Sequence, residues 1–155
     1  MKNRAMVHGD DKPVKKRVLF LCTANRCRSQ LAEALVNRDL GDRFEAFSAG
    51  TNPKTPHPLA LKVLAEIGID HAAARSKHLR EFDGQTFDYV VTLCDEANES
   101  CPVFLGGTTR IHIGVENPDD AAGSEEERMI VFRRVRDWLR EHVEARLCQE
   151  EKNRK

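Results

Sequence analysis

The sequence has no long apolar run and no excess of charge of either sign. No stretch approaches the roughly 20 consecutive apolar residues that cross a bilayer, and residues 1–16 lack the apolar core of a secretion signal. Lys plus Arg and Asp plus Glu number 25 each, so the formal net charge is zero. This balance gives no electrostatic basis for binding nucleic acid or an anionic membrane. We therefore expect a cytoplasmic protein that binds neither.

Metal-ligand patterns are also absent. The six histidines are scattered, and none has metal-ligand spacing with any of the five cysteines. In a chain without a secretion signal, cysteines are expected to be reduced and reactive rather than joined in a structural disulfide framework. The sequence therefore predicts thiol chemistry and no metal site.

A chain of 155 residues is long enough for one domain with a hydrophobic core. Residues 1–16 are predicted to form a disordered extension, and residues 17–148 the catalytic domain. Residues 149–155 are predicted to be a charged tail that frays from Gln149.

Strand-like and helix-like patterns alternate along this domain. The predicted strands are residues 17–22, 44–48, 88–93 and 110–113. The predicted helices are residues 29–40, a helix that starts at 55 or 56 and ends at Gly68, and a last helix that opens at Ser124 with Glu127 completing a capping box. This alternation predicts a single α/β domain with a four-stranded parallel sheet flanked by helices on both faces. Ligands of such sheets bind at the carboxyl ends of the strands, where Cys22 and Cys94 both lie.

The stretch from Cys22 to Ser29 joins the first predicted strand to the first helix. Backbone N–H groups at a helix start lack partners within the helix and carry partial positive charge, so an oxyanion would bind there. The guanidinium of Arg28 can take two oxygens of such an anion, and the same positive field favours the thiolate form of Cys22. We predict Cys22 as a nucleophile, rather than a buried cysteine that merely ends a core strand. The predicted oxyanion-binding loop comprises Thr23, Ala24, Asn25, Arg26, Cys27 and Arg28.

A second pair of cysteines, Cys94 and Cys101, lies in a polar segment. On a helix, seven residues rise roughly 10.5 Å, whereas a disulfide needs Cα atoms about 4.4–6.8 Å apart. The pair would therefore need local unwinding to bond, as in a redox switch. The alternative is one buried cysteine at a strand end and one incidental surface cysteine.

A cysteine, five further residues, an arginine and a serine follow the first predicted strand. This pattern resembles the low-molecular-weight tyrosine phosphatase superfamily. The fuller string from Cys22 to Glu33, with Cys94 and Cys101, resembles its thioredoxin-coupled arsenate reductase branch. The resemblance extends to about Leu147 and implies a relay without metal or organic cofactor. In that relay Cys22 attacks arsenate, Cys94 then attacks Cys22 and releases arsenite, and Cys101 takes over the disulfide with Cys94. Thioredoxin then reduces this last disulfide, and phosphate or sulfate would compete for the loop.

Several neighbouring residues have predicted supporting roles. Ser29 is placed to hydrogen-bond the Cys22 thiolate or to cap the first helix. The resemblance further implies that Asn25, Glu33 and Ser48 match positions that hold potassium in some family members. Lys77 stands where the family has a fourth ligand, so we expect its ammonium to replace the ion. Cys27 is expected to be a packed thiol.

The expected general acid is the main departure from the family. The family carries Asp immediately before a proline, and the matching residue is Asn117, which cannot donate an acidic proton. Three explanations compete: Glu116 or Asp119 acts as the acid in place of Asn117, water protonates the leaving oxygen, or the reaction is slow. General acid catalysis contributes about 10²–10⁴-fold, and phosphate esters with poor leaving groups would suffer most.

Two other functions compete with arsenate reduction. One is a tyrosine phosphatase that uses Cys22 and Arg28, against which stand Asn117 and the scarcity of aromatic residues near the expected substrate rim. The other is a non-catalytic module that binds oxyanions or senses redox state.

Overall fold

A computed structural model gives the structure of the chain and describes residues 14–95 and 102–154. Every predicted helix and strand is present. In chain order the elements are β1 (Lys16–Leu21), α1 (Arg28–Asp39), β2 (Phe44–Ala49), α2 (Pro58–Ala65), the 3-10 helix η1 (Leu79–Phe82), β3 (Phe87–Thr92), β4 (Gly107–His112), the 3-10 helix η2 (Pro118–Asp120) and α3 (Glu125–Asn153). α2 starts later than predicted because His57 caps it, accepting the N–H of Leu59, and Pro58 occupies its first position.

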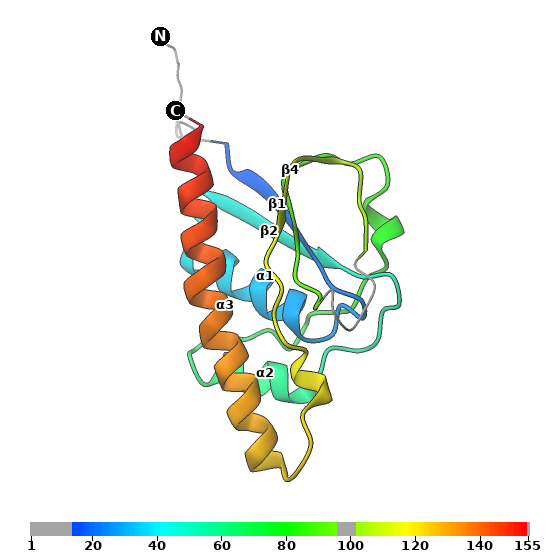
Figure 1. Cartoon of the computed structure of the whole chain (residues 1–155), viewed down its shortest axis with the longest axis vertical. Coiled ribbons are helices and arrows are strands. Elements are labelled where there is room, and N and C mark those ends of the chain that lie inside the picture. The colour runs from blue at the N-terminus through cyan, green and yellow to red at the C-terminus, as the bar shows by residue number, and fades with distance from the viewer. Residues whose placement is uncertain (1–13, 96–101, 155) are drawn as a thin grey trace.

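The four strands form one parallel sheet in the order β2-β1-β3-β4 (Figure 1). β1 pairs with β2 on one side and with β3 on the other. Its residues Val18 to Leu21 are completely buried, as expected of a strand with neighbours on both edges and cover on both faces. The predicted single α/β domain with a four-stranded parallel sheet is confirmed.

The two faces of the sheet are covered differently. Because side chains alternate along a strand, Phe20 packs in the layer of α1, α2 and α3, whereas Leu19 packs in the layer that contains η1. Figure 1 shows α3 along one side of the sheet and η1 on the other. Edge-to-face aromatic contacts complete the second layer, in the pairs Phe47–Phe82, Phe47–Phe87, Phe82–Phe87 and Phe87–Phe104. The helical cover on this second face is therefore a 3-10 helix rather than an α-helix.

α3 is the longest element, with 29 residues. It begins with the predicted capping box, in which the side chains of Ser124 and Glu127 each accept the other's backbone N–H. The prediction that the chain frays from Gln149 is wrong, because the last turns of α3 pack against the sheet. There the Tyr89 hydroxyl donates a hydrogen bond to Glu151.

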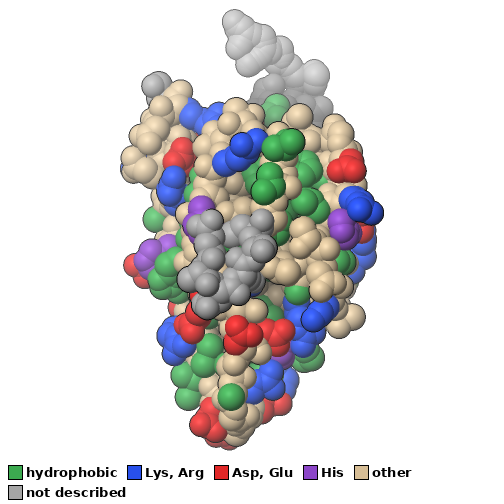
Figure 2. Space-filling model, turned by 45° about the vertical axis from the view of Figure 1, so that its right-hand side comes forward, with side chains coloured by type: hydrophobic (Ala, Val, Ile, Leu, Met, Phe, Trp, Pro, Cys, Tyr) green, Lys and Arg blue, Asp and Glu red, His purple; other side chains and the backbone are tan. Residues whose placement is uncertain are grey.

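The surface carries charge of both signs. Lys and Arg side chains are mixed with Asp and Glu side chains over the face shown in Figure 2, in agreement with the formal net charge of zero. Within residues 14–95 and 102–154, no helix has the length and apolar character needed to cross a bilayer. Electrostatic effects therefore arise from local clusters of charge rather than from a net field.

Candidate active site

The oxyanion loop (residues 22–28) connects β1 to α1. Cys22 directly follows the last residue of β1, and Arg28 is the first residue of α1. Between them Asn25 adopts the left-handed conformation, with φ of 48°, which asparagine tolerates better than most residues. The chain thus turns sharply from the strand into the helix, as the sequence predicts.

Backbone contacts fix the direction of the peptide groups in this loop. Three N–H groups of residues 52–57 donate to carbonyl oxygens of the loop. The pairs are Asn52 to Thr23 (2.9 Å), Lys54 to Ala24 (3.0 Å) and His57 to Arg26 (3.1 Å). In a planar trans peptide the N–H points opposite to the C=O, so the N–H groups of Ala24, Asn25 and Cys27 point away from residues 52–57. This direction is compatible with the anion cradle that the sequence predicts at this loop.

Gly50 lets the end of β2 approach this loop closely. A Cβ atom at Gly50 would lie 2.4 Å from the carbonyl oxygen of Thr23 and 2.6 Å from that of Cys22. Both neighbours are backbone atoms that cannot move aside without distorting the cradle. Glycine is therefore required here for packing.

The Cys22 sulfur lies 2.9 Å from the Ser29 hydroxyl oxygen. Asn25 determines which of the two is the donor. Its Oδ1 accepts the backbone N–H of Lys77 at 2.8 Å, so the other end of the amide is Nδ2, which donates to Ser29 Oγ at 2.7 Å. Because Ser29 Oγ accepts from Asn25, its own proton is available for the sulfur of Cys22. This geometry supports the predicted role of Ser29 toward a thiolate, whereas Ser29 lies within α1 and is not its cap.

Arg28 is 2 % exposed and joins the loop to two other segments. Its Nη1 donates long hydrogen bonds to the carbonyl oxygens of Leu93 at 3.5 Å and Val115 at 3.3 Å. The guanidinium is thus placed beside the cradle by the end of β3 and by the segment that precedes η2. It also lines the cavity described next.

A cavity of about 240 Å³ lies over the loop. It is lined by Cys22, Thr23, Ala24, Arg26, Cys27, Arg28, Asn52, Lys54, Asn117, Asp119 and Asp120. This volume is below the roughly 300–1,000 Å³ of ordinary ligand pockets, and none of the lining residues is aromatic. A small polar anion fits such a site better than an aromatic ester. Sequence reasoning missed Asn52, Lys54 and Asp120, because only the folded chain brings them to the loop.

The three residues of the predicted acid region, Glu116, Asn117 and Asp119, occupy different environments. Asn117 and Asp119 line the cavity, whereas Glu116 does not. The Glu116 carboxylate instead accepts two hydrogen bonds of 2.9 Å from Arg134 on α3. Asn117 Oδ1 accepts the backbone N–H of Asp119 and so caps η2. The geometry therefore does not favour Glu116 as the acid.

Both oxygens of Asp119 make polar contacts. Arg26 Nε donates to Oδ2 at 2.9 Å, and His57 Nε2 lies 3.3 Å from Oδ1. His57 Nδ1 accepts the N–H of Leu59, and His57 Nε2 also lies 3.1 Å from Nη2 of Arg128, which can only donate. Burial lowers the pKa of His57; the cations Arg26 and Arg128 add to this effect, while Asp119 opposes it. His57 does not line the cavity; it is buried beside Asp119 and packs against the ring of Phe132.

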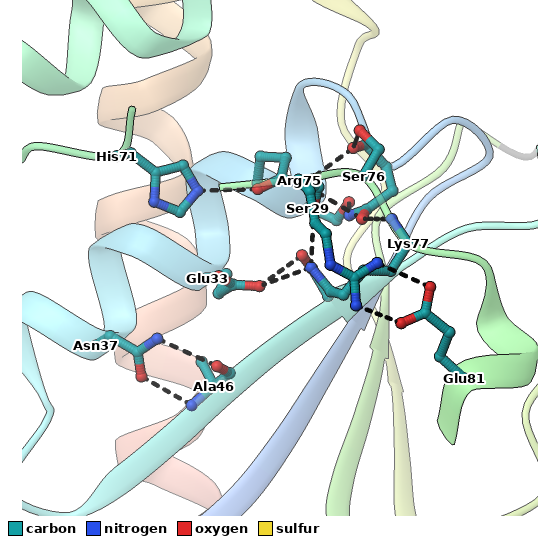
Figure 3. Close-up of polar contacts among 12 residues, drawn as sticks. Ser29, Glu33, Asn37, Ala46, His71, Arg75, Ser76, Lys77 and Glu81 are labelled. Carbon is teal, nitrogen blue, oxygen red and sulfur yellow. Dashed lines mark hydrogen bonds and ion pairs between the residues drawn. The ribbon is translucent and has the colours of Figure 1, made fainter. Parts of the chain in front are cut away.

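The predicted supporting residues come together behind the loop (Figure 3). Ser48 Oγ donates to Glu33 Oε1 at 2.6 Å, and the Lys77 ammonium lies 3.8 Å from the same oxygen. The backbone of Lys77 also holds Asn25, as described above. The lysine thus supplies a positive charge beside Glu33. Among the described residues, no group of three or more His, Cys, Asp or Glu side chains is arranged to hold a metal ion.

Cys22 and Cys94 follow neighbouring strands at one edge of the sheet. The residues that precede them are joined by a backbone hydrogen bond of 2.9 Å, from Leu93 N to Leu21 O. Cys94 is completely buried and is disulfide-bonded, whereas Cys22, Cys27 and Cys148 are free thiols. Cys101 lies outside the described residues.

Cys27 lies in the loop but differs from Cys22. Burial is the main effect that raises the pKa of its thiol, and the nearby Asp119 adds to it. Cys27 therefore remains a protonated thiol at neutral pH, which agrees with the expectation of a packed residue.

The chain is similar to low molecular weight phosphatases and to arsenate reductases. The family described as low molecular weight phosphotyrosine protein phosphatase matches residues 17–155. The arsenate reductase of Halalkalibacterium halodurans is 41% identical over 131 residues, which are 84% of this chain and 94% of that protein. A solved structure described as an arsenate reductase in the phosphate binding state has a TM-score of 0.71 at 29% identity, covering 86% of this chain and 98% of its own. A thioredoxin-dependent arsenate reductase of Corynebacterium glutamicum has a TM-score of 0.59 at 28% identity, covering 84% of this chain and 61% of its own.

Proposed function

Because the chain belongs to the low molecular weight phosphotyrosine protein phosphatase family, we propose that it reduces arsenate to arsenite through Cys22, Cys94 and Cys101. The observation that carries this proposal is the position of Cys94. It follows the strand next to the one that leads to Cys22, and it is disulfide-bonded while Cys22 is a free thiol. A phosphatase needs only the first cysteine, whereas a relay needs a second thiol at the same edge of the sheet. The relatives named arsenate reductases support the same choice.

In the first step the N–H groups of the cradle and Arg28 hold arsenate over Cys22. The Cys22 thiolate, stabilised by the Ser29 hydroxyl, attacks arsenic, so that a sulfur–arsenic bond forms and an arsenic–oxygen bond breaks. The leaving oxygen takes the electron pair and a proton and departs as water. Arg28 offsets the negative charge of the anion and of the attacking sulfur.

The second step transfers electrons to arsenic. A Cys94 thiolate attacks the sulfur of Cys22, a Cys22–Cys94 disulfide forms, and the sulfur–arsenic bond breaks. Its electron pair stays with arsenic, which leaves as arsenite, so arsenic gains two electrons and the two sulfurs lose two. Cys101 then attacks Cys94, which frees the Cys22 thiolate and leaves a Cys94–Cys101 disulfide.

Water supplies the proton of the first step. Asn117 is not an acid, Glu116 is bound to Arg134, and Asp119 accepts from Arg26 and lies 3.3 Å from His57. The loss of an acid is tolerated better for arsenate, whose oxygens exchange readily, than for a phosphate ester with a poor leaving group. This favours arsenate reduction over tyrosine phosphatase activity.

Thioredoxin is the proposed reductant of the last disulfide, and the Corynebacterium glutamicum neighbour supports this choice. Phosphate and sulfate, which share the tetrahedral shape of arsenate, would compete for the cradle. Such a relay requires a compartment that keeps thiols reduced, so the proposed location is the cytoplasm.

The test is a coupled assay with arsenate, thioredoxin, thioredoxin reductase and NADPH. We expect NADPH oxidation in proportion to arsenate, and a Cys101→Ser variant that stops after one turnover with a Cys22–Cys94 disulfide detectable by mass spectrometry. Cys148→Ser, which removes a free thiol far along α3, is the matched control and should turn over normally. A phosphatase would instead hydrolyse an aryl phosphate and tolerate Cys101→Ser, and a binding module would do neither. The absence of arsenate-dependent NADPH oxidation would contradict the proposal.

A further inference from the structure

An ion pair joins two walls of the cavity that Cys22 lines. Arg26 belongs to the oxyanion loop and Asp119 to η2, and both line the cavity. Their side chains meet at 2.9 Å and are 23 % and 33 % exposed, whereas Cys22 is 2 % exposed. This Arg26–Asp119 bridge is therefore more accessible to solvent than the reactive sulfur of the same cavity.

Both ends of the bridge are fixed by further contacts. Arg26 Nη1 donates to the carbonyl oxygen of Thr55 at 2.9 Å. Asp119 Oδ1 lies 3.3 Å from His57 Nε2. The bridge thus connects three segments, namely the oxyanion loop, the segment that precedes α2, and η2. A contact anchored on both sides is held in place more firmly than a single mobile side chain would be.

The side on which the leaving group departs makes the position of the Arg26–Asp119 bridge important. In an in-line displacement the leaving group departs on the side opposite to the attacking sulfur. Since Cys22 is the more deeply buried residue, the leaving group points toward the more exposed part of the lining, to which the bridge belongs. For an inorganic oxyanion this group is a single oxygen, whereas for an aryl ester it is an aromatic ring. A cavity of about 240 Å³ is below the usual size of a ligand pocket and leaves little space for a ring beside the anion.

We infer that the Arg26–Asp119 bridge is a specificity determinant that admits inorganic oxyanions and small phosphate compounds and excludes aryl phosphate esters. This inference rests on the proposed function, because it names the substrate class of the same cradle. It assigns to Arg26 and Asp119 a role at the opening that is separate from the relay of cysteines.

The test compares two phosphorylated probes that differ in size. Acetyl phosphate and p-nitrophenyl phosphate both have good leaving groups, so the missing acid at Asn117 limits neither of them. In each case Cys22 forms a sulfur–phosphorus bond, the phosphorus–oxygen bond breaks, and acetate or p-nitrophenolate leaves with the electron pair. Water then attacks phosphorus, releases phosphate, and returns the electron pair to the Cys22 sulfur. Hydrolysis of each probe therefore reports access to the cradle.

Asp119→Ala removes one end of the bridge, and Glu125→Ala is its matched control, because it removes an ion pair of the same length, to Lys62, outside the cavity. We expect the wild-type protein to prefer acetyl phosphate, and Asp119→Ala to raise the ratio of kcat/KM for p-nitrophenyl phosphate over acetyl phosphate at least tenfold. Glu125→Ala should change this ratio less than twofold. Asp119→Asn, which keeps the size of the side chain but loses the charge, should raise the ratio by a smaller factor and serves if Asp119→Ala does not fold.

A purely structural role for the bridge would lower both rates together and leave the ratio unchanged, which would overturn the inference. An equal preference of the wild-type protein for the two probes, hydrolysis of neither, or an equal effect of Glu125→Ala would also overturn it. Arsenate-dependent NADPH oxidation is measured in parallel on the same samples. Its absence, with the ratio behaving as expected, would refute arsenate reduction and leave the bridge as the size filter of a phosphatase.

Discussion

Asn25 Nδ2 donates a hydrogen bond of 2.7 Å to the hydroxyl oxygen of Ser29. This contact directs the Ser29 proton toward the Cys22 sulfur, which lies 2.9 Å from the same oxygen. The reactivity of Cys22 therefore depends on the left-handed conformation of a loop residue. The same conformation lets the loop present its N–H groups to an anion.

Ser29→Ala should lower the rate at which iodoacetamide alkylates Cys22 at pH 7 by about tenfold. A hydrogen bond to a charged group contributes about 1.5–3 kcal/mol, and 1.4 kcal/mol corresponds to tenfold. The rate is measured by peptide mass spectrometry. Ser124→Ala removes the cap of α3 and is the control: it should cost about 1 kcal/mol of stability and leave the alkylation rate unchanged. Equal rates in wild type and Ser29→Ala would show that Ser29 does not act on the sulfur.

Asn117→Asp should restore a general acid at the cavity. The new carboxyl can still accept the backbone N–H of Asp119, and its acidic neighbours favour the protonated form. We expect the exchange of ¹⁸O between inorganic phosphate and water to rise about 10²-fold, at the lower end of acid catalysis. Inorganic phosphate is small relative to the cavity of about 240 Å³, so access does not limit this assay. An unchanged exchange rate would mean that position 117 does not reach the leaving oxygen.

Lys77→Asp should make the fold respond to potassium. The variant exchanges the ammonium near Glu33 for a carboxylate beside the oxygens of Asn25, Glu33 and Ser48. A potassium concentration ten times the dissociation constant would then add about 1.4 kcal/mol to the free energy of unfolding. Urea unfolding in potassium and in sodium buffers measures this gain in the free energy of unfolding. Wild type and Lys77→Met should show no difference between the two salts, and a difference in wild type would show that Lys77 does not replace the ion.

Folding stability should decrease as the pH falls below 6.5. Burial lowers the pKa of both His57 and His71 from the ordinary value of 6.5. The unfolded chain then binds more protons than the folded one, so stability rises with pH through this window and is fully present above it. Each histidine contributes at most about 1.4 kcal/mol per pH unit.

Urea unfolding at pH 7.5 and pH 5.5 checks this slope. His57→Asn keeps an acceptor for the N–H of Leu59 and does not titrate, so this variant should lose less stability between the two values. If His57→Asn lost as much stability as wild type between the two pH values, the assignment of this pH dependence to His57 would be contradicted.

Local features of the site were predictable from sequence, whereas contacts between distant segments were not. The strand, loop and helix around Cys22 follow from residues within a dozen positions, and so does the capping box at Ser124. By contrast, Arg26 and Asp119 are 93 positions apart, and nothing near either residue indicates its partner. His57 was missed because its cap on α2 and its contact with Asp119 both depend on how the turn after β2 packs on the loop.

The cradle is built before any anion arrives, since residues 52–57 and the close approach at Gly50 hold its backbone. A preformed ring of amide groups recognises the shape and the charge of an anion. Arsenate and phosphate have nearly the same shape and nearly the same charge. Affinity alone therefore cannot separate the two anions. In the proposed mechanism, discrimination falls to the next event, because arsenic can accept an electron pair when a second thiol cleaves the adduct and phosphorus cannot.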